Sequence, residues 1–302
     1  MSKPPYRAGF VALAGRPNTG KSTLLNALLG EKLAIVAHQP QTTRTAVQGV
    51  LTTPDAQIVF IDTPGIHEAD TLFNRRMMEV VRGALADPDL VLFVVDASRQ
   101  LTQDDRHAVS ALGRSATALL VPNKIDRMAD KRLLLPLIQQ YLEVFPFVEA
   151  VPLSARTGDG LEELKRVIKT RLPEGPPFFP DDYLTDQPMR FLAAEVIREQ
   201  ILRSTRQEVP HAVAILIDEW EETPTLTRIS ATIHVERAGQ KTILIGNGGQ
   251  MLKQIGSGAR QELERRLGHK VFLSLFVKVK PNWREDSSFL EVLDWRSMVG
   301  SE

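Results

Sequence analysis

A loop of small and charged residues near the N-terminus has the spacing of a phosphate-binding loop. Glycines let a backbone wrap phosphate groups with its N–H groups pointing inward, and a helix N-terminus adds partial positive charge. Lys21 can neutralise the β- and γ-phosphates, and the Ser22 hydroxyl can bind Mg²⁺. A plain glycine turn is disfavoured, because an apolar stretch, the loop, a Lys-Ser pair and a helical pattern follow in the required order. The loop reads Gly15-Arg16-Pro17-Asn18-Thr19-Gly20-Lys21-Ser22 and is followed by Thr23.

A second candidate segment, Asp62-Thr63-Pro64-Gly65, ends an apolar stretch some forty residues after Lys21. A carboxylate there can hold Mg²⁺ through water, and the Gly65 N–H can reach a γ-phosphate. Taken alone, the segment would be the ordinary end of a strand. Its distance from the phosphate loop favours Asp62 as the acidic residue that holds the metal.

A third segment, Asn123-Lys124-Ile125-Asp126, predicts which base is bound. Asp126 can accept hydrogen bonds from guanine N1 and N2, whereas adenine lacks this donor pair and would leave the carboxylate unpaired. We expect Asn123 to support the loop, the Lys124 stem to cover the ring, and the Ala155 N–H of Ser154-Ala155 to meet guanine O6. These residues predict GTP and GDP as ligands and disfavour an ATP-using kinase.

Two further segments are candidate switches. The first, from Gln39 to Thr45, contains Thr42 and Thr43, and we favour Thr43 as a Mg²⁺ ligand present only with the γ-phosphate. The second runs from Ile66 to Ala69, directly after Gly65. A polar surface loop is the alternative for the first segment.

The elements that must position these residues alternate between strands and helices. This alternation predicts an α/β domain with a mostly parallel six-stranded sheet and helices on both faces. Residues 47–53 and 57–62 flank a Pro-Asp-Ala turn and predict one antiparallel hairpin. The other strands are expected at 10–14, 91–95, 118–121 and 148–152, and helices at 21–29, 72–85, 104–112, 131–145 and 161–171.

A proline-rich stretch then divides the chain. Four prolines in residues 172–180 exclude a helix or a central strand. We expect a first domain over residues 1–172, a linker over 173–184 and a smaller α+β domain over 185–302. In the last, a helix is predicted over 188–205 and strands over 212–220, 227–235 and 271–279. We also expect a strand over 241–245 and two helices, 249–255 and 259–267.

The second half contains a GxxG loop, Gly246-Asn247-Gly248-Gly249, which opens a helix. A glycine loop lets a sugar–phosphate backbone approach the peptide closely, as in KH domains, which clamp about four nucleotides. Between Arg237 and Arg284 there are ten Lys or Arg and two acids, a net charge of +8, although the whole chain has a net charge of zero. This basic region predicts an RNA surface, with a solvated helix face as the alternative. Asn247 stands where KH loops are often basic, so phosphate contacts would come from Lys253 or Lys241.

The composition limits the remaining possibilities. The chain has 302 residues, 43% of them apolar, 25% charged and none cysteine. We therefore expect two globular domains without disulfides or thiolate metal sites. No apolar run is long enough to span a bilayer, and no signal peptide is seen. A cytoplasmic protein is expected, with peripheral contact at the inner membrane face left open, and no DNA partner is expected.

Together these motifs resemble the Era/TrmE/EngA branch of translation-factor-related GTPases, and the complete order of domains is similar to the Era family. The resemblance implies binding near the 3′ end of 16S ribosomal RNA and a role in assembling the 30S subunit. It also implies that Lys21, Thr43, Gly65 and Asn18 serve hydrolysis. Ile66 stands where many signalling GTPases place a water-orienting glutamine. Asn18 either binds K⁺, as in some relatives, or only tightens the loop.

The sequence leaves two other interpretations of the function open. A tRNA-modification GTPase is disfavoured, because such enzymes usually carry an extra domain or a cysteine. A signalling GTPase with a protein-binding C-terminal domain is the other alternative, and RNA binding by the second domain would separate them.

Overall fold

The computed structural model describes residues 5–37, 39, 41–113, 115–205, 209 and 212–295. Pro40 of the expected first switch segment and residues 296–302 of the expected second domain lie outside the described residues. Contacts divide the chain into two compact units. The first comprises Met1–Ala34, Pro40–Asp70 and Asn74–Asp186, and the second comprises Ile35–Gln39, Thr71–Phe73 and Gln187–Glu302.

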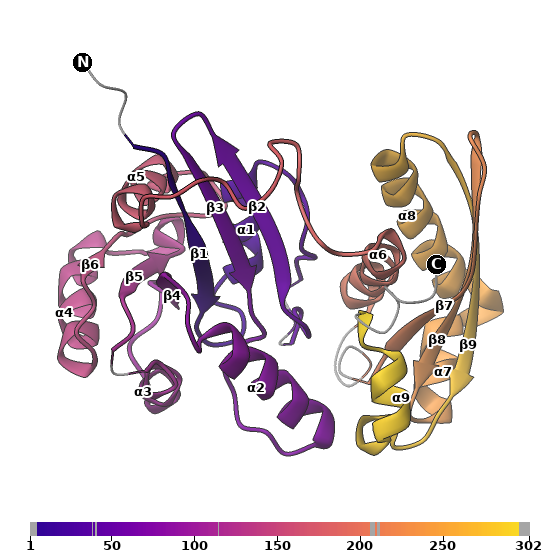
Figure 1. Cartoon of the computed structure of the whole chain (residues 1–302). Coiled ribbons are helices and arrows are strands. Elements are labelled where there is room, and N and C mark those ends of the chain that lie inside the picture. Colours follow the sequence, from indigo (N-terminus) through magenta and orange to yellow (C-terminus); the bar gives the residue numbers. More distant parts are fainter. Residues whose placement is uncertain are drawn as a thin grey trace. The chain divides into compact units, whose positions relative to one another are not determined.

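The first unit is built on a six-stranded sheet in the order β2-β3-β1-β4-β5-β6 (Figure 1). Only β2 is antiparallel, pairing with β3 as the predicted hairpin. The central strands are buried apolar runs, as expected for a parallel sheet covered on both faces. The strands are β1 (Arg7–Ala14), β2 (Val47–Thr53), β3 (Ala56–Asp62), β4 (Leu90–Asp96), β5 (Ala118–Asn123) and β6 (Glu149–Ala150).

Helices connect these strands, and their faces follow from the strand order. The chain moves from β1 to β3 in one direction and from β3 through β4 and β5 to β6 in the other. Right-handed crossovers therefore place α1 on one face and α2, α3 and α4 on the other. Helix α5 contacts α1. The helices are α1 (Lys21–Leu29), α2 (Leu72–Ala84), α3 (Gln103–Ser110), α4 (Leu134–Val144) and α5 (Leu161–Arg171).

The strand expected over residues 148–152 is only two residues long. Val151 and Leu153 nevertheless donate backbone N–H groups to Leu120 and Pro122 of β5, both at 2.9 Å. The segment therefore still runs along β5 and delivers the following residue, Ser154, to the end of the sheet.

The proline-rich segment is held against the β2–β3 hairpin. The Gln57 side chain donates to the Phe179 carbonyl at 2.9 Å and accepts the Phe178 N–H at 2.7 Å. Farther along, the Val50 N–H donates to the Leu184 carbonyl at 2.8 Å. Prolines leave few N–H groups to pair, so these few contacts with the hairpin fix the segment.

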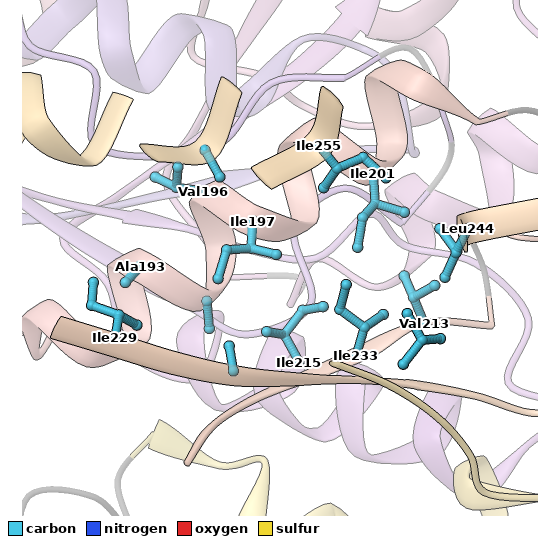
Figure 2. Close-up of a cluster of buried hydrophobic side chains, with 14 of the residues drawn as sticks. Ala193, Val196, Ile197, Ile201, Val213, Ile215, Ile229, Ile233, Leu244 and Ile255 are labelled. Atoms are coloured by element: carbon cyan, nitrogen blue, oxygen red, sulfur yellow. The ribbon is translucent and has the colours of Figure 1, made fainter. Parts of the chain in front are cut away.

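The second unit is a three-stranded sheet with α6, α7 and α8 on one face and α9 on the other. Strand β7 is antiparallel to β8, and β8 is parallel to β9. Side chains from α6, α7 and α8 meet those of β7 and β8 in one buried cluster (Figure 2). A smaller cluster includes Ala214, Trp283 and Phe289. The elements are α6 (Met189–Ser204), β7 (Ala214–Glu222), β8 (Leu226–Val235), α7 (Ala238–Ile245), α8 (Gln250–Leu267), β9 (Lys270–Val279) and α9 (Ser287–Val292).

Two predictions for this unit were wrong. Residues 241–245 belong to helix α7 and not to a strand. Residues 249–255 and 259–267 do not form two helices, because α8 runs unbroken through Gly256 and Gly258. The predicted architecture is confirmed: a mostly parallel six-stranded sheet with helices on both faces, followed by a smaller α+β unit.

Candidate nucleotide site and GxxG loop

The three nucleotide-site segments meet at one edge of the first sheet. The phosphate loop follows β1, Asp62 ends β3 and Asn123 ends β5. Because these strands are parallel, their carboxyl ends lie at the same edge, where ligands bind in open α/β sheets. The Asn123 amide donates to the Thr19 carbonyl at 2.9 Å and thereby joins the base segment to the phosphate loop.

The phosphate loop needs its glycines for steric reasons. Gly15 has φ +136°, and a Cβ there would lie 2.2 Å from the Val94 carbonyl oxygen. Gly20 has φ +100°, and a Cβ there would lie 2.4 Å from the Asn123 amide nitrogen. The Arg16 side chain turns to the start of α3, where it pairs with Asp104 at 2.7 Å. Only the backbone of Arg16 therefore contributes to the loop.

Lys21 is buried and donates to the carbonyls of Gly15 at 3.0 Å and Arg16 at 2.9 Å. Burial lowers the pKa of its ammonium to about 8, and the nearby Asp62 partly opposes that shift. A phosphate beside Lys21 would favour the charged form and offset the burial penalty. The position thus suits an anion.

Three oxygen-bearing side chains form a compact cluster next to Lys21. The Ser22 hydroxyl lies 2.7 Å from both Thr43 Oγ1 and Asp62 Oδ2, and Thr43 Oγ1 lies 3.1 Å from the same carboxylate oxygen. Burial raises the pKa of Asp62, opposed by Lys21 and by the two hydroxyls.

This cluster fits a magnesium ion. In the described part of the chain, the buried Oδ1 of Asp62 has no hydrogen-bond partner. Hydroxyl and carboxylate oxygens are the ligands that Mg²⁺ takes, together with water and phosphate oxygens. Among the described residues there is no group of three or more His, Cys, Asp or Glu that could hold a metal. Ser22, Thr43 and Asp62 are the metal candidates, because their side-chain oxygens lie within 3.1 Å of one another.

The base segment is braced from several directions. Asn123 Oδ1 accepts the Ala155 N–H at 2.9 Å, and Ser154 Oγ donates to Asp126 at 2.7 Å. Lys124 Nζ donates to Asp96 Oδ2 at 2.7 Å, which fixes the lysine stem. Sequence reasoning missed Asp96, because its contact with Lys124 requires β4 and β5 to be neighbours.

The segment around Gly65 packs tightly on the phosphate loop. A Cβ on Gly65 would lie 2.5 Å from the Pro17 nitrogen, so only glycine fits. The buried Thr63 donates its hydroxyl to the Leu13 carbonyl at 2.7 Å and thus braces the segment. Pro64 is also buried.

In the second unit, the GxxG loop links α7 to α8. Gly246 closes α7 by donating its N–H to the Thr242 carbonyl at 2.9 Å. Asn247 and Gly248 are exposed at the tip, and Lys253 is exposed on the first turn of α8. Lys241 is half-buried on α7. The predicted loop and both lysines therefore lie in one region of this unit.

Comparison with known proteins separates the two halves in the same way. Residues 10–124 match the family model described as 50S ribosome-binding GTPase, and residues 208–284 match the KH domain. No helix among the described residues has the length and apolar character that crossing a membrane requires.

Whole-chain relatives are also found. The chain is 50% identical to the GTPase Era of Geobacter metallireducens over 298 residues, which cover 98% of this chain and 100% of the relative. It is 45% identical to the GTPase Era of Nostoc sp., covering 98% and 92%.

Two solved structures are similar over nearly the whole chain, each with 41% identity, a TM-score of 0.92 and coverage of 96% of this chain and 99% of theirs. One is an Aquifex aeolicus Era variant bound to GDP·AlF₄⁻. The other is Era with MgGDPNP and nucleotides 1506–1542 of 16S ribosomal RNA. Matching in both domains and along nearly its whole length, this chain belongs to the Era family of GTPases.

Proposed function

We propose that this GTPase acts in the cytoplasm as a switch that binds the 3′ region of 16S ribosomal RNA and assists assembly of the 30S subunit. The observation that carries the proposal is the similarity to the Era structure that holds MgGDPNP and nucleotides 1506–1542 of 16S ribosomal RNA. The net charge of +8 between Arg237 and Arg284 supports an RNA ligand, since phosphate contacts supply most of such affinity.

In the proposed nucleotide site, the backbone from Gly15 to Gly20 surrounds the phosphates and Lys21 neutralises them. Ser22 and Thr43 would hold Mg²⁺ directly, and Asp62 would hold it through water. When bound, Mg²⁺ would neutralise charge developing on the phosphate oxygens. The Gly65 N–H contacts the γ-phosphate, so it senses whether that group is present.

The guanine base is proposed to bind at the braced segment after β5. Asp126 accepts from guanine N1 and N2, and the Ala155 N–H meets guanine O6. Lys124, held by Asp96 at 2.7 Å, covers the ring with its stem. Asn123 keeps the loop in place through its bonds to Thr19 and Ala155.

For RNA, we propose that the GxxG loop lets the sugar–phosphate backbone approach the peptide, with Lys253 and Lys241 supplying charge. Gly248 offers a clean test, because a Cβ there meets nothing within 4 Å and its φ of +57° is one that Asp tolerates. Gly239 on α7 is a matched control, because its Cβ position is also open and Asp adds the same charge.

The test measures binding of the 3′ segment of 16S ribosomal RNA to the full chain at fixed salt, with a non-hydrolysable GTP analogue present. Gly248→Asp should weaken RNA binding at least about tenfold, because its side chain blocks the approach of the RNA backbone and its charge repels the phosphates. Gly239→Asp should change RNA affinity only through the net charge of the protein. GTP hydrolysis should be unchanged in both variants. Equal RNA affinity in wild type and Gly248→Asp would exclude the GxxG loop as the RNA site.

A further inference from the structure

The two candidate switch segments are joined in the first unit by a chain of side-chain hydrogen bonds. Gln41 comes from the first segment, His67 from the second and Asn74 from α2. Gln41 Nε2 lies 3.2 Å from His67 Nε2 and 3.2 Å from Asn74 Oδ1. His67 Nδ1 lies 2.6 Å from the carbonyl oxygen of Gly65.

The direction of every bond in this chain follows from its two ends. The Asp70 carboxylate accepts only, so the buried Asn74 turns its NH₂ group to Asp70 and its oxygen to Gln41. Gln41 must then present its NH₂ group, and His67 Nε2 must accept from it. His67 Nδ1 therefore carries the proton and donates it to the Gly65 carbonyl, which can only accept. All of these hydrogen bonds can form when His67 is neutral and carries its proton on Nδ1.

At its His67 end, this series of hydrogen bonds fixes the peptide between Gly65 and Ile66. Its carbonyl oxygen accepts from His67, and its N–H donates to the Gly15 carbonyl of the phosphate loop at 3.1 Å. A peptide plane bonded at both ends cannot rotate freely. The position of the Gly65 N–H, on the neighbouring peptide, is thereby restricted as well.

The conformation of Gln41 is consistent with a role at this point. It has φ +61°, which is uncommon for a residue other than glycine, asparagine or aspartate. Such conformations persist where the surroundings hold them, and the bonds to His67 and Asn74 do so here.

We propose that Gln41 and His67 act as a pair of positioning residues for GTP hydrolysis. Gln41 holds the His67 ring, and the ring holds the Gly65–Ile66 peptide against the phosphate loop. The aliphatic Ile66 cannot orient a water molecule, so positioning in this segment falls to the backbone. Because Gln41 lies two residues before Thr43, the pair forms only when both switch segments are in place. The inference rests on the proposed contact between the Gly65 N–H and the γ-phosphate.

The test measures kcat and KM for GTP hydrolysis by the full chain with saturating Mg²⁺, and in parallel the affinity for GDP. Gln41→Ala and His67→Ala should each lower kcat about 10- to 100-fold, as expected for small displacements of a positioned group. GDP affinity should be unchanged, because GDP has no γ-phosphate for Gly65 to contact. Gln139→Ala on α4 and His107→Ala on α3, both exposed, make the same chemical changes elsewhere and should hydrolyse GTP like wild type.

Two further variants separate a pair from two independent residues. The Gln41→Ala, His67→Ala double variant should be no slower than the slower single variant, since either change breaks the same chain. His67→Asn can still donate to the Gly65 carbonyl and should recover part of the rate lost in His67→Ala. In the His67→Asn background, Gln41→Ala should have no further effect.

Several outcomes would overturn the pair. These are an unchanged kcat in either alanine variant, multiplicative losses in the double variant, or a parallel loss of GDP affinity that indicates a general structural role. Gly65→Ala tests the underlying assumption separately, because a Cβ there would collide with Pro17. Wild-type turnover in Gly65→Ala would refute the proposed role of Gly65 itself, whatever the pair does.

Discussion

Several side chains at the nucleotide site are bonded to partners far away in the sequence. Ser22 contacts Asp62, Asn123 contacts Thr19, and Lys124 contacts Asp96. Motif spacing predicted five of these six residues, because each belongs to a segment with its own chemistry. Asp96 was missed, since its contact depends on β4 and β5 lying side by side, which no local pattern reports. The link from Gln41 to His67 was also missed, because it joins two segments whose proximity no local pattern reports.

At this scale, Asp126 should determine base specificity. In Asp126→Asn, an amide replaces the acceptor carboxylate, so guanine loses its partner while xanthine, with an oxygen at that position, gains one. Hydrogen bonds to charged groups contribute about 1.5–3 kcal/mol each, so GTP affinity should fall by more than ~100-fold. Competition between GTP and XTP for the variant measures this. Wild-type affinity for GTP would show that the base binds elsewhere.

Asn18 leads to a second residue-scale prediction. It is exposed and has φ +63°, and its backbone carbonyl oxygen accepts a hydrogen bond from Lys124 Nζ at 2.5 Å. An arginine finger is worth about 10³–10⁵ in kcat, so K⁺ in that role should accelerate hydrolysis at least ~10-fold. We expect faster turnover in KCl than in NaCl at equal ionic strength, and loss of the difference in Asn18→Ala. Equal wild-type rates in both salts would leave Asn18 a role only in loop conformation.

At the scale of elements, the first unit was predicted better than the second. Strands such as β4 are uninterrupted buried runs, and their spacing from the helices was regular. The segment 241–245 is short and apolar, and such a run cannot be assigned to strand or helix by periodicity. It is helical because Leu244 packs into the cluster formed by α6, α8 and the sheet. Gly256 and Gly258 suggested a break in α8, but packing of Ile255 and Ala259 in the same cluster overrides their low propensity.

The contact between β8 and α9 leads to a prediction about how the stability of the second unit depends on pH. His234 of β8 lies edge-on to Phe289 of α9, with ring centroids 4.9 Å apart. Burial, followed by Lys278 and Lys280, lowers the pKa of His234, and Asp218 partly opposes this. The unfolded chain therefore binds the proton first as pH falls, and the second unit should lose stability below about pH 6.5.

Replacing the histidine should remove that contribution. His234→Phe keeps a ring against Phe289 but cannot be protonated, so its stability should fall less between pH 7.5 and 5.5. The difference should be a few tenths of a kcal/mol, because the ring is only half-buried and partly screened. Urea unfolding followed by tryptophan fluorescence measures it, since all three tryptophans, at 220, 283 and 295, belong to the second unit. Parallel pH profiles would contradict the prediction.

At the scale of the whole molecule, both switch segments continue along the chain into short pieces of the second unit. Ile35–Gln39 runs into the first switch segment, and Thr71–Phe73 follows the second. Within the second unit, the Val36 N–H donates to Glu199 at 3.1 Å, and the Phe73 ring lies 5.2 Å from that of Trp283. We therefore expect a change in either switch segment to be transmitted along the backbone to residues packed in the second unit.

This continuity predicts that RNA and nucleotide affect each other's binding. If RNA binds the GTP and GDP states with different affinities, linkage requires RNA to change the ratio of GTP to GDP affinity by the same factor. The direction follows the solved relative, in which RNA is bound together with MgGDPNP. We expect tighter RNA binding with the GTP analogue than with GDP, by about 1–3 kcal/mol or roughly 5- to 150-fold.

The measurement is RNA affinity at fixed salt with each nucleotide saturating, because salt alone changes such affinities by orders of magnitude. The reciprocal experiment measures GTP-analogue and GDP affinities with and without saturating RNA, and the two factors must agree. Gly248→Asp is the control, since at an RNA concentration that just saturates the wild type it should reduce the effect of RNA on nucleotide affinity while leaving nucleotide binding intact. Indistinguishable RNA affinities in the two states would mean that the two units bind their ligands independently, and that the continuity of the switch segments with the second unit transmits no free energy.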